Sequence, residues 1–278
     1  MRAQMAYLPL ATYSESASDD SIVATVGFAA SLGSGLHVTT FGVAVPPMTS
    51  PFGTFLLDVP ELIHMTEERS KAECLRLQDV VQKAAAAEIK LEVSSRQVML
   101  GAMLDAAATE ARSYDVALIP WSSEVRSVQD VAEAVVFGSG RPTILVPPKA
   151  TLAPIDHITI AWDASPVAAR ALWDALALVP DDCRVTVLTI RDEKPLSGPD
   201  LAGSLAAQLE KRGYKAGPVD VALGERTIAS ALQESALEAG AQLLAMGGFG
   251  HSRLRDFILG GATHGVLTDL RLPVLLSH

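Results

Sequence analysis

The sequence has 278 residues, of which 49% are hydrophobic and 19% are charged. This balance excludes an intrinsically disordered chain, which needs low hydrophobicity and high charge, and the length suits one large domain or two of ordinary size. The net charge of −10 argues against a nucleic-acid partner, because affinity for the phosphate backbone comes mainly from Lys and Arg. No apolar run reaches the roughly 18–20 residues of a membrane span, and the N-terminus carries no convincing cleavage signal. We therefore expect a cytoplasmic protein with no membrane partner.

The first half of the chain alternates between segments with strand and helix patterns. Helical spacing of apolar residues predicts helices at 18–32, around 58–87 and near 98–112. Apolar, β-branched runs predict strands at 5–11, 37–45, 89–93, 116–121 and 142–148. Strands separated by helices are the order of an α/β fold.

The second half repeats this order. Strands are predicted at 157–163, 183–190, 218–222, 242–248 and 272–278. Helices are predicted at 165–179, 199–212, 225–240 and 260–270. Ser165 is placed to be an N-cap, with Pro166 at the first helical position, and Gly240 suits the position just past a helix end. The alternation implies right-handed crossovers and a parallel sheet.

The ends of the two halves show that the chain is an internal repeat. DVALIPW…RPTILVPP matches QLLAMGG…LPVLLSH when Asp115 is placed against Gln242 and Pro142 against Pro273. The proline-rich segment 147–154 between the halves predicts a short, stiff linker.

We therefore predict two α/β domains, residues 1–148 and 154–278. Each is expected to be an open parallel-sheet α/β sandwich with about five strands. The two are expected to pack face to face as an internal pseudo-dimer.

The stretch 247–265, GGFGHSRLRDFILGGATHG, holds six of the twenty glycines and directly follows a predicted strand. The matching segment of the first half is four residues shorter and has no closely spaced glycine pair after its strand. Ligands of open parallel sheets bind beyond the carboxyl ends of strands, and glycine lets backbone N–H groups approach a phosphate at a helix N-terminus. On composition alone, a structural turn and an anion site are equally open.

The spacing of Gly247, Gly250 and Gly260 is G-x2-G-x9-G. With this spacing after the fourth strand of a repeat, the sequence resembles the universal stress protein family in its tandem, two-domain form. A first strand ending in Asp163 and a PVL run at 273–275 extend the resemblance. The architecture resembles the family over the whole chain, whereas the glycine motif occurs only in the second half. The stretch matches neither a Walker A loop, since no GK[ST] follows, nor the dinucleotide fingerprint, which follows a first strand.

The resemblance implies a Rossmann-like fold of the adenine nucleotide alpha hydrolase-like type, with AMP, ADP or ATP bound in the second half and Mg²⁺ supplied through the phosphates. The implied adenine contacts at the ends of the first two strands are Ala161, Asp163 and Ile190. The implied ribose and phosphate contacts, from the last strand residue through the glycine motif, are Met246, Gly247, Gly250, Gly260, Gly261 and Ala262. Gly261 departs from the family, which has Ser or Thr there, and Thr263 is the nearby hydroxyl able to substitute.

Other residues keep two interpretations each. His251, Arg253 and Arg255 either neutralise phosphate oxygens or are solvent-facing loop charges. Asp163 either contacts the ligand or caps the helix that follows it. Trp121, in the matching loop of the first half, either fills a vacated pocket or lies at an interface.

The sequence marks no catalytic residue and no metal site. It has no Ser-His-Asp spacing, no paired carboxylates in a shared motif and no clustered histidines. Cys74 and Cys183 are expected to be buried, apolar residues. We therefore expect a stress-response regulatory protein that binds a nucleotide in its second half and has a degenerate first half. A nucleotide-free scaffold protein and a slow ATPase are the alternatives, and a homodimer stays open.

Overall fold

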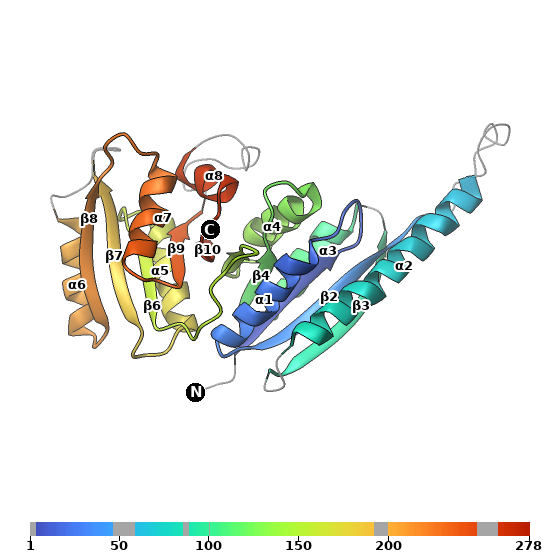
Figure 1. Ribbon diagram of the computed structural model, residues 1–278, viewed down its shortest axis with the longest axis horizontal. Helices are drawn as coiled ribbons and strands as arrows, with labels where there is room; N and C mark the ends of the chain where they lie inside the picture. Colours follow the sequence, from blue (N-terminus) through green and yellow to red (C-terminus); the bar gives the residue numbers. More distant parts are fainter. Residues whose placement is uncertain (1–3, 47–58, 86–88, 100, 192–199, 249–260) are drawn as a thin grey trace.

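The computed structural model describes residues 4–46, 59–85, 89–99, 101–191, 200–248 and 261–278 (Figure 1). The first half contains β1 (Met5–Ala11), α1 (Asp19–Ser31), β2 (Gly35–Ala44), α2 (Val59–Ala84), β3 (Leu91–Met99), α3 (Met103–Ala111), β4 (Val116–Pro120), α4 (Arg126–Gly138) and β5 (Thr143–Val146). The second half contains β6 (His157–Ala161), α5 (Pro166–Leu178), β7 (Arg184–Arg191), α6 (Leu201–Lys211), β8 (Lys215–Ala222), α7 (Ile228–Glu238), β9 (Leu243–Gly247), α8 (Gly261–Thr268) and β10 (Val274–Ser277). The predicted α/β fold is confirmed.

Both halves of the chain have the same strand order. It is β3-β2-β1-β4-β5 in the first half and β8-β7-β6-β9-β10 in the second. All strand pairs within a half are parallel. The order reverses between β1 and β4 and again between β6 and β9, so each half has the switch point of a doubly wound sheet.

The two halves join edge to edge through β5 and β10, which pair antiparallel. The predicted face-to-face packing of the two halves is therefore wrong, because both halves contribute to one continuous sheet. Both seam strands, TILV and VLLS, are fully buried. An exposed apolar strand edge is a template for aggregation, and pairing these two strands with each other covers both edges.

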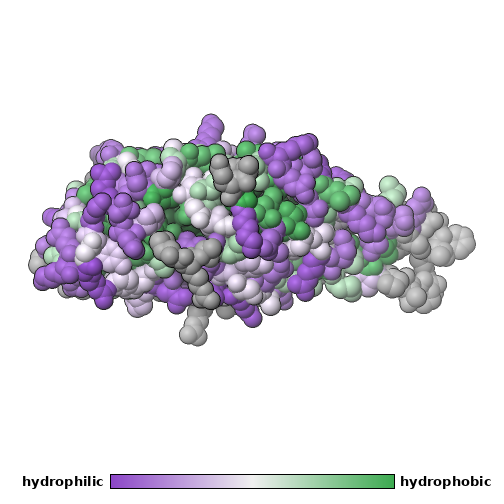
Figure 2. All heavy atoms as spheres, turned by 90° about the horizontal axis from the view of Figure 1, so that it is seen from below, coloured by the Kyte–Doolittle hydropathy of each residue, from purple (hydrophilic) through white to green (hydrophobic). Residues whose placement is uncertain are grey.

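Helices cover both faces of the sheet, as right-handed crossovers require. α1 packs against α2, α3 against α4, and α7 against α8. The N-terminal end of α2 projects beyond the rest of the molecule, as Figure 1 shows. Seen from below, hydrophobic residues are visible around the middle of the molecule, and hydrophilic residues dominate the end formed by the second half (Figure 2).

The local sequence signals are confirmed with small shifts. Ser165 is the N-cap of α5, Pro166 is its first residue, and Gly240 after α7 has a φ of 77°. β3 continues to Met99, so α3 begins at Met103 and not near residue 98. α4, at Arg126–Gly138, is an additional helix that was not predicted from the sequence.

Candidate functional site

The carboxyl ends of β6 and β9 lie side by side at the switch point of the second half. Ile160 of β6 pairs with Ala245 of β9, so the next residues, Ala161 and Met246, lie at the same edge of the sheet. Ala161 is half-buried and Met246 is buried. Open parallel sheets bind their ligands at such an edge.

Asp163 lies in the turn that leads from β6 into α5. Its Oδ1 accepts a hydrogen bond from Ser165 N at 2.9 Å, and Ser165 Oγ accepts one from Ala168 N at 3.2 Å. Between them, Ala164 has a φ of 61°, a conformation that residues other than glycine rarely adopt. Ser165 is therefore the helix cap, and the Asp163 carboxylate holds the turn before it.

Ile190 lies on the neighbouring strand, near the carboxyl end of β7, and is buried. Thr189 Oγ1 donates to Trp162 O at 3.0 Å, and Trp162 N donates to Leu188 O at 2.8 Å. These bonds tie β7 to the residue before Asp163. The predicted adenine contacts thus come from adjacent strand ends.

Gly247 lies where α5 passes over the end of β9. A Cβ atom on Gly247 would be 2.6 Å from Val167 Cγ2 and 2.8 Å from Ala168 N, which is too close for any side chain. The nearest atoms to a Cβ on Gly248 would be 3.7 Å away. The first glycine of the motif therefore lets the first turn of α5 pack against the strand end.

α8 carries the end of the glycine motif. Gly261 is its first residue, and Ala262 and Thr263 follow in its first turn, both half-buried. A helix N-terminus presents unpaired N–H groups and the positive end of the helix dipole, which favour an anion. The other motif and loop residues, which lie outside the described residues, are Gly250, His251, Arg253, Arg255 and Gly260.

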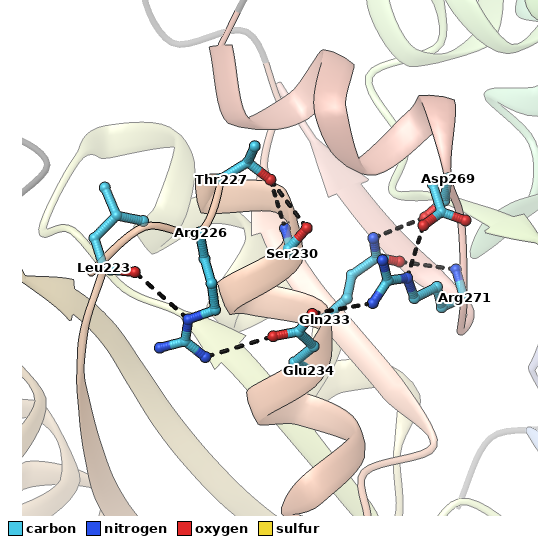
Figure 3. A network of polar contacts seen from close by, with 8 residues as sticks. All are labelled: Leu223, Arg226, Thr227, Ser230, Gln233, Glu234, Asp269 and Arg271. Carbon is cyan, nitrogen blue, oxygen red and sulfur yellow. Dashed lines mark hydrogen bonds and ion pairs between the residues drawn. The ribbon is translucent and has the colours of Figure 1, made fainter.

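α8 is held against α7 by close packing and by a buried glutamine (Figure 3). A Cβ on Gly265 would be 2.7 Å from Ala229 Cβ, so the two helices lie in close contact. Gln233 Nε2 donates to Asp269 O at 2.8 Å, and Arg271 N donates to Gln233 Oε1 at 2.8 Å. Gln233 therefore fixes the turn that follows α8.

The strand register identifies the matching positions of the first half. β1 pairs with β4 in the same register as β6 pairs with β9. Counted along these strands, Ala11 takes the place of Asp163. Pro120 takes the place of Gly247. The first half thus lacks both the carboxylate and the glycine. A small cavity lined by apolar residues of β1, β4 and α4 lies at its switch point.

Trp121 takes the place of Gly248. Trp121 N donates to Val146 O at 2.9 Å. Gly248 N donates to Ser277 O in the same way, also at 2.9 Å. The Trp121 side chain is buried, and its Nε1 donates to Leu267 O of α8 at 2.9 Å. Of the two interpretations of Trp121, the interface is confirmed, because the indole joins the first half to α8.

A second contact from the first half lies close to Gly248, the residue that follows β9. The ring of Phe137 in α4 lies 4.8 Å from that of His278, at an angle of 75°. His278 Nδ1 is 3.3 Å from Gly248 O. His278 therefore contacts Gly248, and Phe137 of the first half packs against His278.

Three further features of the described parts of the chain concern metal ligands, membrane spans and cysteines. No three His, Cys, Asp or Glu side chains there are placed to hold a metal ion, and none of the helices there is long and apolar enough to cross a membrane. Cys74 and Cys183 are buried, as predicted. Burial raises the pKa of the Cys183 thiol to about 11, which keeps it in its unreactive protonated form.

Comparison with known proteins agrees with this arrangement. A profile of the universal stress protein family matches residues 154–278. A universal stress protein from Archaeoglobus fulgidus is 16% identical, with a TM-score of 0.67 over 98% of this chain and 95% of that chain. A putative universal stress protein from Pseudomonas aeruginosa is 13% identical, with a TM-score of 0.50 over 99% and 93% of the respective chains.

A universal stress protein in complex with cAMP is 18% identical, covers 45% of this chain and 97% of that chain, and has a TM-score of 0.33. No curated protein matches the chain. The two full-length likenesses show the fold of both halves. Residues 154–278 therefore match the universal stress protein family, and the N-terminal half that precedes them has the same strand order.

Proposed function

We propose that the chain is a stress-response regulatory protein that binds one adenine nucleotide, AMP, ADP or ATP, at the β6–β9 switch point of its second half. The observation that carries the proposal is the difference between the halves at equivalent positions. The second half has Asp163 and Gly247, whereas the first has Ala11 and Pro120. A carboxylate accepts hydrogen bonds from an adenine amino group, and a methyl group does not.

The remaining contacts follow from the strand ends and from α8. Ala161 and Ile190 supply apolar surface beside the adenine. The N–H groups at the start of α8, around Ala262 and Thr263, face the phosphates with the helix dipole behind them. Since Gly261 has no hydroxyl, the hold on the terminal phosphate is weaker than on the rest of the nucleotide. We propose that Mg²⁺ binds only together with the nucleotide phosphates. We also propose that the protein is cytoplasmic.

Isothermal titration of the purified protein with ATP tests the proposal. We expect about one site per chain, and an affinity at least about tenfold lower in Asp163→Ala, because a hydrogen bond to a charged group contributes about 1.5–3 kcal/mol. Asp182→Ala is the matched control, since Asp182 is exposed beside the amino end of β7, at the opposite edge of the sheet. Two equivalent sites per chain, or equal affinities in both variants, would contradict the proposal.

A nucleotide-free scaffold protein is the second candidate, and it is favoured by the loss of the hydroxyl at Gly261. It predicts no heat of binding with ATP, ADP, AMP or cAMP and no nucleotide in the denatured protein by mass spectrometry. A slow ATPase predicts phosphate release by the wild-type protein that Asp163→Ala lacks.

A further inference from the structure

α8 is too short and too poor in helix-forming residues to hold its position alone. It has eight residues, GATHGVLT, and glycine and threonine are weak helix formers. Isolated helices of this length are not stable in water, so contacts with neighbouring elements determine where such a helix lies. Contacts along the rest of the helix therefore determine the position of the N-terminus of α8, which is the end next to the proposed phosphates.

Those contacts come from both halves of the chain. Within the second half, Gln233 donates to Asp269 O just after the helix (Figure 3). From the first half, Trp121 Nε1 donates to Leu267 O. Leu267 lies in the last turn of α8, where backbone carbonyls lack partners inside the helix. The indole thus caps the carboxyl end of α8 from the other half.

The residue of the second half that is equivalent to Trp121 is a glycine, which has no side chain to make such a contact. Gly248 occupies the equivalent place and makes the same backbone hydrogen bond to the last strand of its half. The first half therefore has Ala11 and Pro120 where the second has Asp163 and Gly247, and it has a buried side chain, Trp121, that contacts the other half. Its matching helix α4 is longer, with 13 residues.

We propose that Trp121 is a positioning residue for the nucleotide site of the second half, and that through it the first half sets the nucleotide affinity of the second. The proposal rests on the proposed function. The two ends of α8 are roughly 12 Å apart, at 1.5 Å per residue, and a two-turn helix transmits displacement of one end to the other. A first half without a nucleotide of its own thereby controls the N–H groups that face the phosphates.

Trp121→Phe tests the proposal, because it keeps an aromatic ring and removes the N–H donor. At a temperature where circular dichroism shows the variant fully folded, we expect ATP to bind about fivefold more weakly by isothermal titration, the effect of losing one hydrogen bond. The matched control is Trp173→Phe. Trp173 is 43% exposed on α5, and its ring lies 4.6 Å from the Arg212 guanidinium. The same substitution there should leave the affinity unchanged.

Amide hydrogen exchange without nucleotide gives a readout that does not depend on the proposed function. In Trp121→Phe the amides of residues 265–268 should exchange about fivefold faster, while those of α7 keep their wild-type rates. Unchanged α8 exchange together with unchanged ATP affinity would overturn the proposal, as would equal effects of Trp121→Phe and Trp173→Phe. A wild-type protein that binds no ATP overturns the proposed function instead, and the exchange rates then decide alone whether Trp121 positions α8.

Discussion

At the scale of single residues, burial decides which side chains respond to pH. His157, the first residue of β6, is 1% exposed, and its Nε2 lies 2.8 Å from Thr186 Oγ1. Burial, and then the positive charge of Arg184, lower the pKa of His157 below its ordinary value of 6.5. The imidazole is therefore neutral in the folded protein under conditions where it is already protonated in the unfolded chain.

This difference predicts a loss of stability in mild acid. Above pH 6.5 both states carry a neutral His157. As the pH falls below 6.5, the unfolded chain takes up the proton first, so the free energy of unfolding decreases until the pH passes the lowered pKa of the folded state. Urea unfolding at pH 7.5 and pH 5.5 should show a smaller decrease in His157→Gln than in the wild type. His64→Gln, an exposed substitution on α2, should keep the wild-type decrease, and an equal decrease in all three proteins would refute the assignment.

The residues of the candidate site differ in how far the sequence reveals them. Asp163 and Gly247 are singled out by their positions at the carboxyl ends of predicted strands and by the resemblance that the glycine spacing supports. The role of Trp121 is not readable in this way, because its hydrogen-bond partner lies 146 positions away in the chain. No local pattern encodes such a contact, and its sequence signal is limited to an aromatic residue where the other repeat has glycine.

At the scale of elements, the packing of α5 on β9 depends on two adjacent glycines with different surroundings. Gly247→Ala places a methyl group 2.6 Å from Val167 Cγ2 and 2.8 Å from a backbone nitrogen of α5. Only Val167 can yield by rotating, so helix and strand must separate.

We expect Gly247→Ala to lower the free energy of unfolding by about 1–3 kcal/mol, the usual cost of overpacking. Gly248→Ala is its matched control and should change stability by less than about 0.5 kcal/mol, since the nearest atom would be 3.7 Å from the new methyl group. Urea unfolding followed by circular dichroism measures both, and equal stabilities of the two variants would contradict the packing role of Gly247.

The elements themselves were largely predictable, because alternating strands and helices with clear end signals are local features. α4 is the exception, although its sequence held the signal. Val128, Val131 and Val135 are buried, with the spacing of one helix face.

At the scale of the whole molecule, the arrangement of the halves was not predictable from either half alone. Strand order follows from the repeat, but the choice between face-to-face and edge-to-edge packing depends on which strand edges stay uncovered. The sequence does contain a hint. The outer strands β3 and β8 carry charged residues such as Glu92, Arg96 and Asp220, whereas TILV and VLLS carry none. Edge strands exposed to water normally carry such charges.

The seam, meaning the contacts between the two halves along β5 and β10, should hold the halves together without a covalent link. Besides the β5–β10 pair, Gln4 Nε2 donates to Ala177 O at 2.7 Å, and Arg170 Nη2 donates to Gly140 O at 3.3 Å. If a protease site is inserted after Lys149 and cleaved, we expect both fragments to co-elute in size-exclusion chromatography at the volume of the uncut protein. Elution as two smaller species would show that the linker, and not the seam, joins the halves.

The antiparallel β5–β10 pair has a consequence for how such a molecule can evolve. In a symmetric dimer of identical chains, every substitution appears on both sides of the interface. A tryptophan at the position of Gly248 would then occupy both sites at once. Joining the two copies in one chain removes this constraint. One copy can then carry a tryptophan that contacts its neighbour, while the other copy keeps glycine at the equivalent position.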